Sequence, residues 1–270
     1  MGYKIYATDG KFDTANTLAY QLLIEAGKDY YSYIVVDEVG KLKAISYCEE
    51  SIFGDIDNSL LQLTYKKTSI SLYTSSFTFI PSQIYSKDDE TVYTQFLETK
   101  GNTSPYTHTL LNDEITGLHT FATNEFNAIK LLFPLAEIFP QYISLINCGY
   151  QQLGSEISPQ LLLNIKLGCV EILILQNNKL LFYNVFDTGN DDEILYYTLA
   201  ACQQNGLEVK DIKLHICGNV ELDSNIYNLL KQYFGKVHFR HHAAVNMDAD
   251  AFGDIIKHQF YSLLSLSACV

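Results

Sequence analysis

Two distant segments of the chain share one pattern of apolar and polar positions. They cover residues 21–47 and 160–186, and in each of them stretches rich in β-branched and aromatic residues alternate with short polar turns. A glycine-containing turn follows the first stretch (Gly27, Gly168), and the polar residues 37–40 or 176–178 follow the second, as in ordinary hairpins. Each segment is therefore predicted to form a three-stranded antiparallel meander.

The residues after each meander also correspond. Apolar residues at helical spacing over 51–63 and 190–206 predict one helix in each half, and strands are predicted at 69–73 and 212–217. The order is thus βββαβ, twice. Three further elements complete the second half as a helix, a strand and a final helix, at residues 221–233, 236–239 and 250–264.

The first half is predicted to be more elaborate. It contains an extra helix, a hairpin of two strands and a second helix, at residues 88–98, 106–111 with 117–121, and 125–138. A polar stretch rich in Gly, Ser and Pro at residues 149–159 indicates a boundary between the halves. We therefore expect a first domain over residues 1–152, which carries the extra helix and hairpin, and a second over residues 153–270.

Length and composition agree with two cores. A chain of 270 residues with 47% hydrophobic residues is long enough for two domains and needs no disulfide framework. Its six cysteines are scattered without a CxxC pair, which predicts reduced, buried side chains: Cys48, Cys148, Cys169, Cys202, Cys217 and Cys269. Neither a secretion signal nor an apolar run long enough to span a membrane is found, so a cytoplasmic location is expected.

Charge narrows the choice of partners. The chain has 18 Lys and Arg against 31 Asp and Glu, a net charge of -13, which repels nucleic-acid phosphates and anionic lipids. Its 20 Tyr and 15 Phe mostly alternate within predicted strands, as on half-buried sheet faces, rather than forming base-stacking platforms. Nucleic acid is therefore not an expected partner, and no membrane insertion is expected.

The duplicated βββαβαβ halves with glycines in their first hairpin turns resemble the actin-like ATPase superfold, a duplicated ribonuclease H-like α/β fold with mixed sheets flanked by helices. Residues 161–239 resemble most the actin-like assembly proteins of type IV pili, type II secretion and cell division, in a phosphate-binding hairpin (161–189) followed by an adenosine-binding turn (211–219). The whole chain, including residues 79–81 and 133–140, resembles a small uncharacterised bacterial family with this fold and no assigned activity. The resemblance implies a fold but not a function.

In working enzymes of this superfold, an acid two residues before a glycine orients magnesium, and the amides of the turn bind phosphate. The corresponding turns are Glu25-Ala-Gly27-Lys28 and Lys166-Leu-Gly168-Cys169, so the second has a lysine in place of the acid. A register shifted by two residues places the uncharged Asn164 there instead. The resemblance thus implies degenerate nucleotide-binding turns, with these candidate residues: Glu25, Gly27, Lys28, Lys166, Gly168, Gly218 and Asn219.

Each candidate also has a plainer structural interpretation, which we favour. Gly27 and Gly168 are interpreted as residues of tight turns that need a positive φ. Gly218 and Asn219 are interpreted as turn residues, because both types tolerate left-handed conformations. Residues 187–192 are expected to cap a helix. His238, His241 and His242 lie next to Arg240 and are interpreted as a solvated loop rather than a metal site.

Three functions remain open. The favoured one is a noncatalytic binding or scaffold module that acts on another protein. The alternative is a weak ATP-binding protein or ATPase that holds ATP with Mg in a cleft between the halves. A small-molecule kinase ranks last, because no general base is found, and neither is a P-loop, a G-x-S-x-G elbow, an H-E-x-x-H motif or a dinucleotide fingerprint. No catalytic or metal-binding residue is predicted, and the oligomeric state is not indicated.

Overall fold

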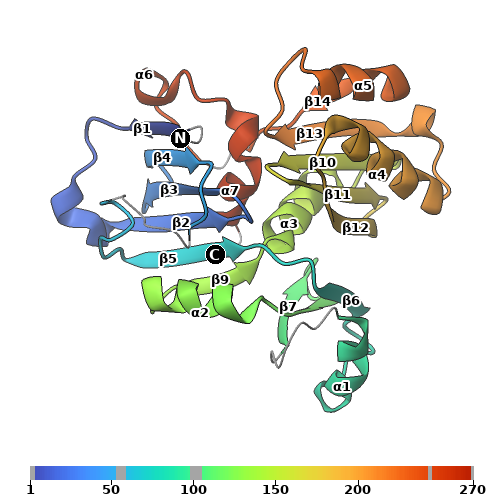
Figure 1. Ribbon diagram of the computed structural model, residues 1–270, viewed down its shortest axis with the longest axis horizontal. Coiled ribbons are helices and arrows are strands. Elements are labelled where there is room, and N and C mark those ends of the chain that lie inside the picture. Colours follow the sequence, from blue (N-terminus) through green and yellow to red (C-terminus); the bar gives the residue numbers. More distant parts are fainter. Residues whose placement is uncertain (1–3, 53–58, 98–104, 243–244, 269–270) are drawn as a thin grey trace. The chain divides into compact units, whose positions relative to one another are not determined.

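The computed structural model describes residues 4–52, 59–97, 105–242 and 245–268 (Figure 1). The chain forms two compact units. One comprises Met1–Ile143 with Asn246–Phe252 and Val270, and the other comprises Ser144–Val245 with Gly253–Cys269. The division between residues 152 and 153 stays a prediction.

The first unit is built on a six-stranded sheet with the order β1-β4-β3-β2-β5-β9. Its strands are β1 (Lys4–Thr8), β2 (Tyr20–Ala26), β3 (Tyr31–Asp37), β4 (Leu42–Cys48), β5 (Lys67–Leu72) and β9 (Glu137–Pro140). Strands β2, β3 and β4 pair antiparallel, which confirms the first predicted meander, and β5 and β9 continue the sheet in parallel. The added strand β1, which was not predicted, pairs antiparallel with β4.

The second unit is built on a five-stranded sheet with the order β12-β11-β10-β13-β14. Its strands are β10 (Gln160–Lys166), β11 (Cys169–Gln176), β12 (Lys179–Asp187), β13 (Lys213–Gly218) and β14 (Val237–Phe239). The second predicted meander is therefore confirmed. The sequence of antiparallel and parallel pairs from β12 to β14 is the same as that from β4 to β9 in the first unit, so the two sheets share one topology.

Helices cover both faces of the five-stranded sheet. Helices α4 (Asp191–Gln204) and α5 (Asn225–Phe234) pack their apolar sides against one face. On the other face lies α3 (Tyr142–Leu153), where a Cβ on Gly149 would stand 2.5 Å from Leu173 Cδ2. Among the described residues, no helix is long and apolar enough to cross a bilayer.

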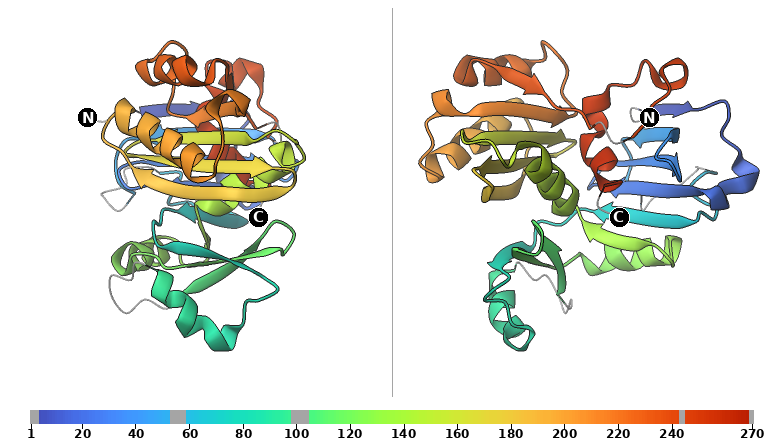
Figure 2. Two further views of the ribbon diagram at one scale, coloured as in Figure 1. Left: turned by 90° about the vertical axis from the view of Figure 1, so that its right-hand side faces the viewer. Right: turned by 180° about the vertical axis from the view of Figure 1, so that it is seen from behind.

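A small lobe is inserted in the first unit between β5 and α2 (Thr123–Leu132). It contains a three-stranded antiparallel sheet, β6-β8-β7, and the short helix α1, drawn in teal to green in the right-hand view of Figure 2. Its elements are β6 (Phe77–Pro81), α1 (Glu90–Tyr93), β7 (Tyr106–Leu110) and β8 (Ile115–His119). The predicted hairpin is confirmed as β7 and β8, whereas the predicted helix over 88–98 is only a single α turn between 3-10 turns, and residue 98 lies outside the described residues.

The structure differs from three further predicted helices. The helix expected over 125–138 ends at Leu132, because Phe133 precedes Pro134 and adopts φ -132°, and the chain then forms β9. The final helix expected over 250–264 is interrupted after Phe252, at Gly253, and continues as a 3-10 turn and α7 (Tyr261–Leu266). At residues 51–52 and 59–63 the chain forms turns and not the expected helix, and residues 53–58 lie outside the described residues.

The polar stretch at residues 149–159, interpreted as the boundary between the halves, is partly helical. Its first residues, up to Leu153, belong to α3, because Gly149 packs closely on the sheet and its missing side chain permits that approach. The turn residues therefore begin only after this helix ends.

Candidate functional site

The first predicted phosphate turn is occupied by Tyr30. Glu25, near the end of β2, is buried, and its Oε1 accepts a hydrogen bond from the phenol of Tyr30 at 3.1 Å. The backbone N–H of Gly27 donates to the carbonyl oxygen of Tyr30 at 3.0 Å. A Cβ on Gly27 would stand 2.1 Å from the Tyr30 ring, and the φ of Gly27 is not positive. The expectation of a left-handed turn is therefore wrong here, since the glycine is required by the ring of Tyr30.

Lys28 follows on the surface of the same unit. Its Nζ lies 5.2 Å from the centre of the Tyr73 ring, within the range of a cation–π interaction. Its charge also acts on Glu125, whose pKa is raised by burial and held back by Lys28. The one exposed cation of this turn thus interacts with groups of its own unit.

The second predicted turn is a tight hairpin whose lysine is buried. Gly168 has φ +76°, which confirms the left-handed turn expected for it. Lys166 is the last residue of β10, and its Nζ donates a hydrogen bond to Ser262 Oγ of α7. The group expected to neutralise phosphate charge therefore contacts a hydroxyl of its own unit.

The shifted register places Asn164 in a buried network that crosses three strands. Asn164 Nδ2 donates to Glu171 Oε2 at 2.6 Å, and the phenol of Tyr183 donates to Glu171 Oε1 at 2.5 Å. Asn164 and Glu171 are almost fully buried. Sequence analysis missed Glu171, although a carboxylate within the apolar run 169–175 was the available signal. The amide is thus bound to a carboxylate of its own sheet.

Gly218 is the last residue of β13 and lies beside Ile165 of the neighbouring parallel strand β10. It has φ +86°, and a Cβ on it would stand 1.9 Å from the carbonyl oxygen of Ile165. The same oxygen accepts the N–H of Asn219 at 2.7 Å, and Asn219 Oδ1 accepts a hydrogen bond from Gln259 at 3.2 Å. Chain packing alone accounts for the glycine, so the adenosine contact stays a prediction.

Residues 187–192 cap α4, as predicted. Asn190 Oδ1 accepts the N–H of Glu193 at 3.0 Å, and Glu193 Oε2 accepts the N–H of Gly189 at 2.7 Å. The first bond satisfies an amide that the first helical turn leaves without a partner, and the second ties the residue before the cap to the helix. Glu193 therefore has a structural role, and Asp191 and Asp192 lie with it in the first turn of α4, where the helix dipole favours acids.

The histidine cluster does not share one environment. His238 and His241 are exposed, but His242 is buried with its ring 6.1 Å from that of Tyr261, and burial lowers its pKa. The solvated-loop interpretation is therefore wrong for His242. Within the described parts of the chain, no group of three or more His, Cys, Asp or Glu residues is arranged to hold a metal ion.

Five cysteines are free and buried, as predicted: Cys48, Cys148, Cys169, Cys202 and Cys217. Cys269 lies outside the described residues.

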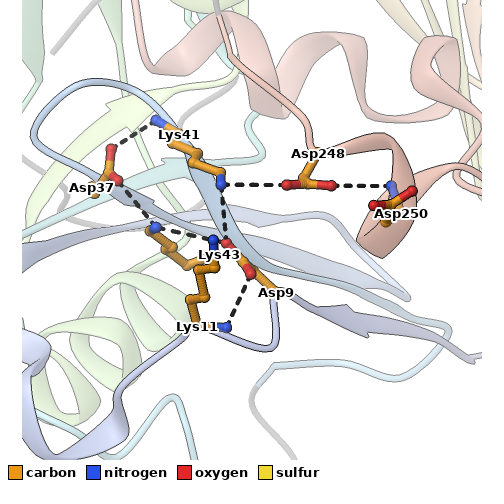
Figure 3. Close-up of polar contacts among 7 residues, drawn as sticks. All are labelled: Asp9, Lys11, Asp37, Lys41, Lys43, Asp248 and Asp250. Carbon is orange, nitrogen blue, oxygen red and sulfur yellow. Dashed lines mark hydrogen bonds and ion pairs between the residues drawn. The ribbon is translucent and has the colours of Figure 1, made fainter.

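A cluster of charged residues that the sequence did not indicate lies at one edge of the first unit (Figure 3). Lys43 Nζ lies 3.7 Å from Asp9 Oδ2 and 3.2 Å from Asp37 Oδ2, and both Asp9 and Lys43 are buried. Lys41 Nζ lies 3.5 Å from Asp9 Oδ2 and 3.4 Å from Asp248 Oδ2. The N–H of Lys11, followed by Lys41 and Lys43, holds the pKa of Asp9 below its ordinary value. The charges compensate one another across segments distant in sequence.

Backbone bonds hold the segment Asn246–Phe252, here named the return segment, at the same edge. The N–H of Asn246 donates to Gly40 O at 3.0 Å, and its carbonyl accepts the N–H of Leu42 at 2.9 Å. Phe252, in α6 (Ala249–Phe252), is buried. The cluster and these bonds join the β3–β4 turn to the return segment, which is a structural role.

The sequence matches one family of proteins. The family model described as "Protein of unknown function (DUF3822)" matches residues 9–237. None of the curated proteins matches the sequence.

Three solved structures give the scale of the likeness. A Bacteroides thetaiotaomicron protein with an actin-like ATPase fold and unknown function aligns with TM-score 0.73 and 17% identity, over 86% of this chain and 94% of that one. A chain of the PilM–PilN type IV pilus biogenesis complex aligns with TM-score 0.62 and 13% identity, over 92% of this chain and 98% of that one. The cytoplasmic domain of EpsL, from the type II secretion system of Vibrio cholerae, aligns with TM-score 0.47 and 11% identity, over 93% of this chain and 94% of that one. The predicted actin-like fold is confirmed by the first two; identities this low establish nothing beyond the fold.

Proposed function

The chain belongs to the DUF3822 family of unknown function, and on that premise we propose that it is a noncatalytic binding or scaffold module with an actin-like fold. One observation carries the proposal. The charged side chains of both predicted phosphate turns contact partners within their own units, Glu25 with Tyr30 and Lys166 with Ser262.

These contacts work against hydrolysis. A carboxylate that orients magnesium needs its oxygens directed at the ion or its waters, and Glu25 is buried with Tyr30 bonded to Oε1. Lys166 supplies positive charge where the second carboxylate would be. The N–H of Gly27, a candidate phosphate donor, already donates to Tyr30 O. A phosphate would have to displace a bond at each of these positions.

The expected partner is another protein. The PilM–PilN complex is an assembly of two proteins, and the chain of that complex that matches has a fold similar to that of this chain. The net charge of -13 argues against nucleic acid. Five buried free cysteines support a reducing compartment and therefore a cytoplasmic location.

Weak binding of ATP with Mg is the second candidate, and one observation favours it. Gly168 keeps a left-handed hairpin turn beside Lys166, and such turns can direct backbone amides at an anion. In this candidate Lys166 leaves Ser262 to reach the phosphates.

A thermal-shift titration with ATP and ADP, with and without magnesium, separates the two candidates. The scaffold proposal predicts no nucleotide-specific shift at millimolar ligand. Binding at a hundredfold over Kd would stabilise by about 2.7 kcal/mol, a rise of several degrees. A shift that Lys166→Ala abolishes and the exposed control Lys213→Ala retains would overturn the scaffold proposal and establish nucleotide binding.

A further inference from the structure

Two histidines lie side by side on neighbouring parallel strands of the second unit. His215 of β13 and His238 of β14 are register partners, so their side chains leave the sheet on the same face. Their ring centres are 5.7 Å apart, and the ring planes are inclined by 36°. His215 is only 6% exposed, whereas His238 is exposed. The pair therefore joins a buried imidazole to one that solvent reaches.

The hydrogen bonds of Gln160 fix the tautomer of the buried ring. The amide nitrogen of Gln160 donates to the carbonyl oxygen and to the hydroxyl of Ser158, at 2.9 and 3.0 Å. Its Oε1 therefore faces His215 Nε2, 2.9 Å away, and an amide oxygen can only accept. A neutral His215 consequently carries its proton on Nε2 and a lone pair on Nδ1.

The Nδ1 atom of His215 is the unsatisfied atom of this ring. It is buried, and no group in the described part of the chain forms a hydrogen bond with it. Gln160 belongs to β10, on one side of β13, and His238 belongs to β14, on the other. Because the two nitrogens of an imidazole point to nearly opposite sides of the ring, Nδ1 is turned toward β14. A buried acceptor without a partner costs stability, and a ligand bound to it would remove that cost.

We propose that His215 Nδ1 and the ring of His238 bind one divalent transition-metal ion that prefers imidazole, such as Zn²⁺. With Zn–N bonds of about 2.0–2.1 Å and a tetrahedral angle between them, two imidazole centres lie about 5 Å apart, close to the 5.7 Å of this pair. Gln160 then accepts the N–H on the far side of the ring, as outer partners of metal-bound histidines do. Two ligands come from the described residues, and water completes the coordination.

Neighbouring charges set the strength of binding. The charges of Arg240 and Lys213 act on His215, and both repel a metal ion. The guanidinium of Arg240 donates to Gln152 Oε1 at 3.1 Å, and Lys213 forms an ion pair with Glu156 at 3.0 Å. The carboxylate of Glu156 offsets part of the repulsion. With two protein ligands and two cations nearby, the site is expected to exchange its ion readily, unlike the closed four-ligand sites that hold zinc as a structural element.

A zinc titration of the full chain, without an added histidine tag, tests the proposal. Isothermal titration calorimetry at about pH 7.5, where an ordinary histidine is neutral, should show one Zn²⁺ bound per chain. His238→Ala removes one of the two ligands from an exposed position and should weaken binding at least about tenfold. His241→Ala, at an exposed histidine three residues further on, is the matched control and should keep the parent Kd. Mg²⁺, which prefers oxygen ligands, should not compete with Zn²⁺.

NMR of the ring nitrogens supplies a second readout. Without metal, His215 should show a protonated Nε2 and an unprotonated Nδ1, and Zn²⁺ should shift the Nδ1 resonance more than that of Nε2. The opposite tautomer, an Nδ1 resonance that Zn²⁺ leaves unchanged, an absence of zinc binding, or an unchanged affinity of His238→Ala would each overturn the proposal. All of these results leave the scaffold proposal standing, because that proposal rests on the phosphate turns.

Discussion

The ring of Tyr30 lies against the α-carbon of Gly27 so closely that any side chain at Gly27 would overlap it, with a Cβ only 2.1 Å from Tyr30 Cε1. Tyr30 has little room to move, because it is buried and its ring stacks on that of Tyr47 at 5.6 Å. The turn that resembles a phosphate loop is therefore closed by its own tyrosine.

Gly27→Ala should lower the free energy of unfolding by about 1–3 kcal/mol, the range typical of overpacking. Urea unfolding followed by circular dichroism would measure it. Gly10→Ala is the matched control, since nothing lies within 4 Å of its added Cβ. Equal effects of the two variants would show that Tyr30 does not restrict the turn.

Gly218→Ala should be more damaging. The added Cβ would stand 1.9 Å from a backbone oxygen, and the residue has φ +86°, so strain of about 1 kcal/mol or more adds to the overlap. We expect a loss of more than about 3 kcal/mol in the same unfolding assay. Gly206 has φ +65° and nothing within 4 Å of an added Cβ, so Gly206→Ala measures the cost of the backbone conformation without any overlap. It should lower the free energy of unfolding by only about 1 kcal/mol.

Tyr183→Phe should destabilise the second unit by about 1–3 kcal/mol, because it removes a donor from the buried carboxylate of Glu171. Tyr196→Phe changes an exposed phenol, 66% accessible, and should stay within about 0.5 kcal/mol of the parent chain. Thermal denaturation of both variants would test whether the network stabilises the fold.

Acid should weaken the charged cluster around Asp9. Its folded pKa lies below the ordinary 3.8, so its contribution to stability is full above that value and is lost as pH falls toward the folded pKa. Unfolding measured from pH 7 to pH 2 should therefore show a steeper loss below about pH 4 in the parent chain than in Asp9→Asn. The exposed Asp29→Asn variant should show the same dependence of stability on pH as the parent chain. If the difference in unfolding free energy between Asp9→Asn and the parent chain does not change with pH, the carboxylate of Asp9 does not stabilise the fold as described.

Local pattern was sufficient for the meanders, because alternation and β-branched composition depend on neighbours in sequence. The partner of Glu171 was also within reach: a two-residue hairpin at 167–168 pairs Lys166 with Cys169 and hence Asn164 with Glu171. Strand β9 was missed because four residues after Pro134 carry too short a pattern to separate from a helix.

Tertiary neighbours could not be predicted in the same way. Lys41 and Asp248 are 207 residues apart in sequence, and nothing in either segment marks the other. The role of Gly27 depends on where the Tyr30 ring packs, which spacing does not determine. The two hairpins in which the resemblance placed phosphate turns are present, between β2 and β3 and between β10 and β11, but the resemblance gave no information on the side chains that occupy them.

The return segment also sets an order of events during synthesis. The β3–β4 turn of the first unit receives Asn246–Phe252 only after Ser144–Val245 has left the ribosome, roughly 5–20 s after Ile143 at ordinary elongation rates. During that interval Lys41 lacks the Asp248 carboxylate, and the site that buries Phe252 lacks its ring. The first unit is therefore complete only when Asn246–Phe252 has been synthesised and has bound to it. We expect this last part of its folding, at the β3–β4 turn, to be post-translational.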